Sequence, residues 1–209
     1  MRRRRLGIMM ERAYEIEAVH EFGLDDKNRT IYISPSEVDG EVDEVMAGTF
    51  VRNMHLLEKI SDDPIEIHLT TCGGSWDYGK AMYDVIRNSP CWVTTISHGW
   101  ARSMSSIIPQ AADERLIMRH CSFMAHRGGD GYEGNAVAFQ SHAEQSQKED
   151  EVMMKMYVDR CVDGYYFKQQ KMGKAKIKAF LQEKFDRKVD WWLTAQEAVR
   201  YGFMDKVVR

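Results

Sequence analysis

The chain has 209 residues, 44% of them hydrophobic, and a formal net charge of −3. This length and composition favour one globular domain with a sizeable core and argue against disorder along the whole chain. The near-balanced charge gives no electrostatic reason to expect binding to nucleic acid. No apolar run is long enough to cross a membrane and no signal-peptide core follows the first residues, so we expect a cytoplasmic protein without membrane contact.

The cysteines argue against metal and disulfide chemistry. There are four of them, widely spaced and without a Cys-x-x-Cys pair: Cys72, Cys91, Cys121 and Cys161. This spacing indicates neither a zinc site nor a disulfide framework, and reduced thiols are the simplest interpretation. We therefore expect no metal and no other cofactor.

The first residues differ in character from the remainder. Residues 1–27 are charged and weakly patterned, which predicts a flexible arm with at most a short strand or turn. The arginines at positions 2–5 are typical of a solvated arm, and the alternative is that they dock a partner or line an entrance. Residues 28–209 contain no long linker, so we predict a single domain there.

Strands and helices are predicted to alternate after the arm. Strand-like segments occur at residues 29–34, 65–69 and 92–97. Apolar residues recur at helical spacing between them, at 39–59 and 78–86. This order predicts an α/β fold with helices packed on a sheet.

The second half begins with two more short strands, predicted at residues 115–119 and 122–126. Residues 135–170 are polar and carry an apolar stripe only near their end. A helix this polar cannot be buried along its whole length, so we expect it to project into solvent or lie against a partner. A capping box of Thr194 and Glu197 starts the last predicted helix.

Ser103 lies where a buried strand-like run changes into the small residues of a predicted helix. Such a turn lifts one side chain clear of the backbone and leaves unpaired N–H groups at the helix start. One hypothesis is a hydroxyl nucleophile with the Met104 N–H as an oxyanion donor. The simpler alternative is that Ser103 only caps the helix.

A serine nucleophile requires two more residue types. A neutral imidazole takes the hydroxyl proton, and a carboxylate fixes the imidazole tautomer and stabilises the imidazolium. His126, at the end of a predicted strand, and Asp190, ahead of two tryptophans, are candidates. Their order alone does not select them among seven histidines and many acids. His126 could be an ordinary buried histidine, and Asp190 an ordinary exposed acid.

Five segments in the same order resemble the ClpP family, the proteolytic subunits of Clp proteases. They lie at residues 71–75 (Thr-Cys-Gly-Gly-Ser), 81–84 (Ala-Met-Tyr-Asp), 99–105 (Gly-Trp-Ala-Arg-Ser-Met-Ser), 123–126 (Phe-Met-Ala-His) and 190–205, which begins Asp-Trp-Trp-Leu-Thr-Ala. The resemblance runs from about residue 28 to the end of the chain. It implies an α/β fold of the ClpP/crotonase-like type, built from repeated β-β-α units, with a projecting handle helix at about residues 132–175.

The resemblance also implies the site residues of a serine endopeptidase. Ser103 would be the nucleophile, His126 the base and Asp190 the acid of the triad. The backbone N–H groups of Gly74 and Met104 would form the oxyanion hole.

A substrate strand would pair with extended backbone on two sides of the site. The residues implied are Gly73, Ser75 and Trp76 on one side and Gly128 and Gly129 on the other. This pairing uses hydrogen bonds to the main chain of the substrate rather than contacts with its side chains, so weak sequence selectivity would follow.

The resemblance further implies a homo-oligomer of stacked sevenfold rings around a chamber, in which unfolded polypeptides are cleaved. An unfoldase of the AAA+ class would feed the chamber. The chain contains no Gly-x-x-x-x-Gly-Lys-Ser/Thr motif, so ATP hydrolysis would belong to the other protein. Two alternatives are a non-catalytic ring subunit with the same fold and a crotonase-type acyl-thioester enzyme.

One interval and three positions depart from the family pattern. The interval from His126 to Asp190 is longer than in typical members, which predicts an enlarged handle region. Cys72 replaces a proline before the double glycine, where a thiol usually acts as a small buried hydrophobe. Arg102 replaces a small residue next to Ser103, and it could pair with an acid or narrow the pocket. Pro109 lies inside the predicted helix and is expected to bend it. The two tryptophans after Asp190 are expected in the core or at an interface.

Overall fold

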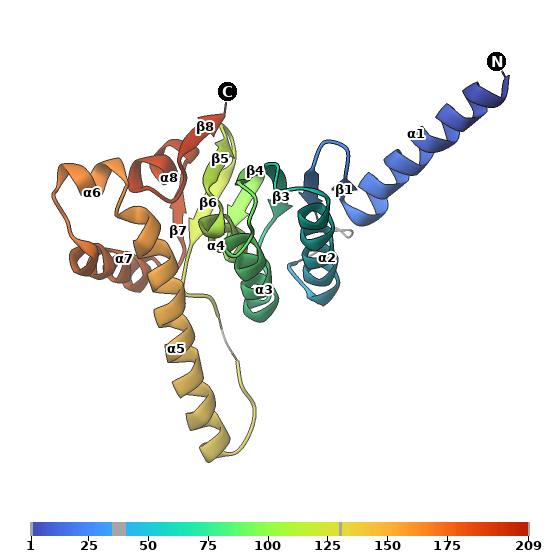
Figure 1. Ribbon diagram of the computed structural model, residues 1–209. Helices are drawn as coiled ribbons and strands as arrows, with labels where there is room; N and C mark the ends of the chain where they lie inside the picture. Colours follow the sequence, from blue (N-terminus) through green and yellow to red (C-terminus); the bar gives the residue numbers. More distant parts are fainter. Residues whose placement is uncertain (1, 35–40, 130, 209) are drawn as a thin grey trace.

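The computed structural model describes residues 2–34, 41–129 and 131–208. Its strands form one branched sheet, and helices pack against the sheet or extend from it (Figure 1). The strands are β1 (Leu24–Asp25), β2 (Thr30–Ile33), β3 (Ile65–Thr71), β4 (Val93–Arg102), β5 (Glu114–Met118), β6 (Ser122–Ala125), β7 (Trp191–Leu193) and β8 (Lys206–Val208). The helices are α1 (Arg2–Phe22), α2 (Glu44–Ile60), α3 (Trp76–Arg87), α4 (Met104–Ile107), α5 (Ala136–Cys161), α6 (Tyr165–Gln169), α7 (Lys174–Lys188) and α8 (Ala195–Tyr201), with a short 3-10 helix, η1 (Ile108–Ala111).

The sheet is mainly parallel, with the strand order β1-β2-β3-β4-β5-β8. β4 is long enough to have two sets of neighbours, because residues 94–97 pair with β5 and residues 100–102 pair with β6. β7 then pairs antiparallel with β6. The sheet therefore branches at the end of β4, and β4, β6 and β7 lie side by side there.

The alternating pattern in β3 and the helical pattern in α2 meet in one core. Ile65, Ile67 and Leu69 alternate inward along β3, and α2 buries an apolar face that includes Phe50 and Leu57. Burying one such side chain contributes about 1.5–3 kcal/mol. The predicted strand and the predicted helix are both confirmed, although α2 begins at residue 44 and residue 39 lies outside the described residues.

The helix predicted after Ser103 is only one turn long. α4 ends at Ile107 and the chain continues as the 3-10 helix η1, with Pro109 in its first turn. A proline at that position has no N–H to leave unpaired and has the φ angle that a helix start needs. Contrary to expectation, Pro109 therefore does not bend a longer α-helix but lies in the first turn of a separate 3-10 helix after α4 has ended.

The arm at the N-terminus has a different local structure from the one expected. Residues Arg2–Phe22 form helix α1, which extends away from the sheet (Figure 1). A short strand is present, but it lies after this helix, at Leu24–Asp25. The helix was not predicted because the residues of this segment show no helical period of apolar positions.

Helix α5 has the projecting arrangement expected of a handle. Its N-terminal half extends beyond the body of the molecule (Figure 1). Its buried residues all lie in the C-terminal half: Met153, Met154, Tyr157, Val158 and Cys161. In the part of the chain that the structure describes, no helix is long and apolar enough to cross a membrane.

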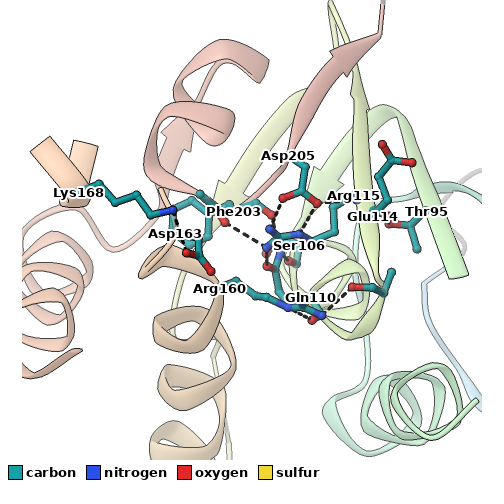
Figure 2. Close-up of polar contacts among 12 residues, drawn as sticks. Thr95, Ser106, Gln110, Glu114, Arg115, Arg160, Asp163, Lys168, Phe203 and Asp205 are labelled. Atoms are coloured by element: carbon teal, nitrogen blue, oxygen red, sulfur yellow. Dashed lines mark hydrogen bonds and ion pairs between the residues drawn. The ribbon is translucent and has the colours of Figure 1, made fainter. Parts of the chain in front are cut away.

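A buried polar network joins the C-terminal strand to the base of this helix (Figure 2). Arg115 of β5 donates from Nε to Asp205 at 2.9 Å and from Nη1 to Gln110 Oε1 and to the Gly202 carbonyl, both at 3.0 Å. Arg160 of α5 donates from Nε to the Gln110 carbonyl at 2.6 Å. These contacts connect β5, η1, α5 and the segment leading into β8.

Candidate active site

Ser103 occupies the sharp turn between β4 and α4. Its backbone has φ 51° and ψ −127°, a left-handed conformation that residues other than glycine rarely adopt. Such a conformation costs about 1–3 kcal/mol and persists only where the surroundings hold it. Here the Ser103 N–H donates a hydrogen bond of 3.0 Å to the Met124 carbonyl on β6.

Strand pairing brings the three candidate side chains to one edge of the sheet. β6 and β7 run antiparallel, and Ala125 pairs with Trp191 at the end of their ladder. The next residues outward are therefore His126 and Asp190, which face each other. β4 and β6 run parallel, so Ser103 leaves the end of β4 at the same edge.

The three side chains form one hydrogen-bonded chain. Ser103 Oγ lies 2.8 Å from His126 Nε2, and His126 Nδ1 lies 3.0 Å from Asp190 Oδ1. A carboxylate only accepts hydrogen bonds, so Nδ1 carries the proton and Nε2 can accept from the serine hydroxyl. This is the tautomer that a general base next to a serine nucleophile requires.

Two glycines follow β3, and the first of them packs directly against the serine turn, whereas the second packs against Val42. Gly73 and Gly74 follow β3 with φ angles of +119° and +142°, which favour glycine. A Cβ added to Gly73 would lie 2.6 Å from Ser103 Cβ and 3.1 Å from the Met104 backbone nitrogen. Any side chain at that position would collide with the serine turn, so only glycine fits there.

The two predicted oxyanion donors come from two segments, the turn after β3 and the start of α4. Met104 is the first residue of α4, so its N–H has no acceptor inside the helix. Gly74 forms a parallel bridge with Val42, in which Val42 N–H donates to the Gly73 carbonyl at 2.7 Å and Ser75 N–H donates to the Val42 carbonyl at 2.8 Å. The bridge uses the flanking residues and leaves Gly74's own N–H outside it.

This bridge changes the expectation for the first substrate segment. The Gly73 carbonyl and the Ser75 N–H already bond to the chain itself, so only the other side of this segment can face a substrate strand. Trp76 begins α3 and packs against the core. Gly128 and Gly129 lie in exposed coil after β6, where a Cβ on either would meet no atom within 4 Å.

Arg102 stacks on aromatic rings instead of pairing with an acid of the described chain. Its guanidinium centre lies 4.8 Å from the ring centres of both Trp100 and Trp192, and its Nε donates to Ser122 Oγ at 2.9 Å. Of the two tryptophans expected in the core or at an interface, Trp191 is buried, whereas Trp192 is half exposed in this stack.

Cys72 also differs from expectation, because it is only partly buried. The four cysteines are all free in the structure. Among the described residues, no group of three His, Cys, Asp or Glu side chains is arranged to hold a metal ion.

The sequence did not point to two contacts close to Ser103. One is the stack around Arg102, because Trp192 and Ser122 come from distant parts of the chain and only Trp100 is a near neighbour in sequence. The other is a hydrogen bond of 2.6 Å from Ser106 Oγ to the Ser103 carbonyl. Serine often bonds back to a carbonyl three residues earlier, so this spacing was a usable signal.

Comparisons with known proteins agree on one family. A family profile described as Clp protease matches residues 26–209. The ATP-dependent Clp protease proteolytic subunit 2 of Pseudomonas aeruginosa is 32% identical over 173 residues, which cover 82% of this chain and 79% of that protein. The ATP-dependent Clp protease proteolytic subunit of Deinococcus radiodurans is 28% identical over 187 residues, covering 87% and 81%.

A solved structure has the same fold. A variant of ClpP1 from Listeria monocytogenes matches with a TM-score of 0.69 at 21% identity, over 88% of this chain and 93% of that chain. The molecule is thus an α/β protein with the ClpP fold, as the resemblance implied. The chain belongs to the Clp protease family, a family of peptidases whose members assemble as homo-oligomers.

Proposed function

We propose that this chain is the catalytic subunit of an ATP-dependent Clp-type serine endopeptidase. The observation that carries the proposal is the hydrogen-bonded chain from Ser103 through His126 to Asp190. Family membership supports the peptide bond as the substrate. The Met104 N–H at the start of α4, directly after the hydroxyl, supports a role in receiving the charge of an attacked carbonyl.

In the first half-reaction, Ser103 Oγ attacks the scissile carbonyl carbon and His126 Nε2 takes the hydroxyl proton. The C=O electron pair moves to the oxygen, and the new imidazolium is stabilised by the Asp190 carboxylate. His126 then protonates the leaving nitrogen and the C–N bond breaks, which leaves an acyl ester on Ser103. Water, deprotonated by the same imidazole, hydrolyses this ester and restores the hydroxyl.

The charge that develops on the carbonyl oxygen would be received by the Gly74 and Met104 N–H groups. Removing one such donor costs about a hundredfold to a thousandfold in rate in serine peptidases. A substrate strand would lie between the open side of residues 73–76 and the exposed coil at Gly128 and Gly129, pairing through its main chain.

The assembly we propose is a pair of stacked sevenfold rings joined through α5, with the sites facing an enclosed chamber. An AAA+ unfoldase would deliver unfolded polypeptides to that chamber and hydrolyse the ATP, because this chain has no phosphate-binding loop motif. The exposed half of α5 supports a role in joining subunits, since its side chains have no core of their own to contact.

A fluorophosphonate probe tests the proposal directly, because it phosphonylates only an activated serine. We expect one adduct per chain at Ser103 on the assembled protein, located by peptide mass spectrometry and lost in Ser103→Ala. The matched control is Ser105→Ala, two residues further along the same turn, which should label normally. An assembled, folded protein that does not label would contradict the proposal and favour the non-catalytic ring subunit.

A further inference from the structure

A buried pair of hydroxyl groups connects helix α5 to the nucleophile turn. The Tyr157 hydroxyl oxygen lies 2.7 Å from Ser106 Oγ, and Ser106 Oγ lies 2.6 Å from the Ser103 carbonyl oxygen. Tyr157 and Ser106 are both 0% exposed. We call these two residues the hydroxyl relay. It begins on α5, passes through α4 and ends on the nucleophile's own carbonyl group.

The direction of the relay follows from counting protons. A carbonyl only accepts, so Ser106 must donate its single hydroxyl proton to the Ser103 carbonyl. Ser106 Oγ is then left as the acceptor for the Tyr157 hydroxyl. Burial raises the pKa of Tyr157, which keeps the phenol in its donating form. The Phe203 ring, edge-on at 5.2 Å between ring centres, fixes the tyrosine ring in place.

The relay ends on the peptide unit that contains the Met104 N–H. The Ser103 carbonyl and the Met104 N–H belong to one planar trans peptide, in which the C=O and N–H bonds point in opposite directions. Fixing the oxygen therefore fixes the direction of the N–H. The Ser103 oxygen accepts from Ser106 Oγ and also from Ser106 N–H at 2.9 Å.

We propose that Tyr157 and Ser106 are positioning residues that aim the Met104 N–H at the developing oxyanion. The inference rests on the proposed function and deepens it, since it states what sets the geometry of one oxyanion donor. Hydrogen bonds to the carbonyl also polarise the peptide, which strengthens its N–H as a donor. The position of α5, the helix we assign to ring contacts, is thereby coupled to the reacting atoms.

Two variants remove one hydroxyl each and keep the remaining shape: Tyr157→Phe and Ser106→Ala. We expect kcat for a fluorogenic peptide to fall about tenfold in each, less than the loss of an oxyanion donor, because the amide is misaimed rather than absent. KM should stay within twofold, since the substrate-pairing segments are unchanged. Rates are compared at a temperature at which circular dichroism shows every variant folded.

Ser105→Ala is the matched control. Ser105 is also 0% exposed and lies on the same turn, but its Oγ has no hydrogen-bond partner among the described residues. Removing its hydroxyl should leave kcat within twofold of the parent. A loss in Ser105→Ala as large as in Ser106→Ala would show that kcat reports general damage to α4, and would overturn the proposal.

The double variant separates a relay from two independent effects. Tyr157 acts on the peptide only through Ser106, so Tyr157→Phe should add no further loss of kcat in the Ser106→Ala background. Losses that multiply would contradict the relay. Normal kcat in both single variants, with a parent protein that is active, would also overturn it while the proposed function stands.

Hydrogen–deuterium exchange needs no substrate, so it tests the relay independently of peptidase activity. Hydrogen–deuterium exchange of the segment 103–107 should be faster in Tyr157→Phe and Ser106→Ala than in the parent and in Ser105→Ala, because the peptide unit is held less firmly. If the parent neither hydrolyses peptides nor labels at Ser103, the proposed function fails, and this comparison still decides the relay. Unchanged exchange in both relay variants would overturn it.

Discussion

Asp190 is the most exposed of the polar partners of His126, with 44% of its side chain accessible. Its Oδ1 nevertheless accepts from His126 Nδ1 at 3.0 Å, and this single contact selects the imidazole tautomer. An exposed carboxylate contributes little through bulk electrostatics because solvent and salt screen it. Its influence on the reaction must therefore come through this one hydrogen bond.

Asp190→Asn tests that role. The amide can present an N–H to Nδ1, which would place the ring proton on Nε2 and block acceptance from Ser103. We expect kcat to fall by about 10⁴, as in the corresponding change in other serine peptidases, with the fold and the melting temperature retained. The control is Asp186→Asn, which breaks an exposed pair with Arg127 and should leave kcat within twofold. Near-normal hydrolysis by Asp190→Asn would mean that another acid serves His126.

At the scale of single residues, the sequence points to a functional residue only where the neighbouring residues form a recognisable local pattern. Ser103 was a candidate because a strand-to-helix turn exposes a hydroxyl, although the same turn fits a simple helix cap, and His126 was selected among seven histidines only by the family resemblance. Asp190 depended on the family resemblance, since a lone acid before two tryptophans has no distinctive chemistry. Tyr157 was visible only as one member of an apolar stripe, because its hydroxyl partner comes from a distant helix.

Among the elements, the C-terminal strand β8 depends on an ion pair between the buried Arg115 and the partly exposed Asp205. Asp205 accepts from the Arg115 backbone N–H at 2.8 Å and from its Nε at 2.9 Å, and the Arg115 side chain is only 5% exposed (Figure 2). A guanidinium buried to this degree needs hydrogen-bond and charge partners to offset its lost hydration, and Asp205 is its carboxylate partner. The contact therefore fixes β8 against β5.

Asp205→Ala should lower the free energy of unfolding by about 1.5–3 kcal/mol, the range for a hydrogen bond to a charged group, because Arg115 loses its carboxylate but keeps its contacts with Gln110 and Gly202. Asp163→Ala is the control, since it breaks an exposed ion pair. Asp163 Oδ1 lies 2.9 Å from Lys168 Nζ, and the side chains of Asp163 and Lys168 are 74% and 60% accessible. That loss should be below about 1 kcal/mol. Urea denaturation at one fixed protein concentration measures both. Equal losses would show that burial of Arg115 is not what matters.

Elements with a regular apolar period were predictable, and those defined by distant partners were not. The capping box places α8 within one residue of its predicted start, because both of its hydrogen bonds are local. β7 has only three residues and exists because β6 offers an edge to pair with. Helix α1 gave no signal, since neither a cap nor an apolar face marks it in the sequence.

At the scale of the whole molecule, the projecting half of α5 carries apolar side chains that this chain does not cover. Val137 is 80% exposed and Phe139 is 59% exposed near the N-terminal end of the helix. Nearby, the Tyr132 ring stacks on His142 with ring centres 4.7 Å apart. Exposed apolar groups on a projecting helix are expected to be covered by another copy in a homo-oligomer.

The double variant Val137→Asp with Phe139→Asp tests this assignment. Burying two carboxylates in a subunit contact is strongly unfavourable, so we expect native mass spectrometry to show loss of the contact between rings, with particles of half the parent mass. Circular dichroism should show an unchanged fold, because neither side chain belongs to the core. Phe139→Tyr is the control, since it keeps the ring and should keep the parent mass. A double variant that retains the parent mass would mean that the rings meet through a different surface, and α5 would then lose its role in joining them.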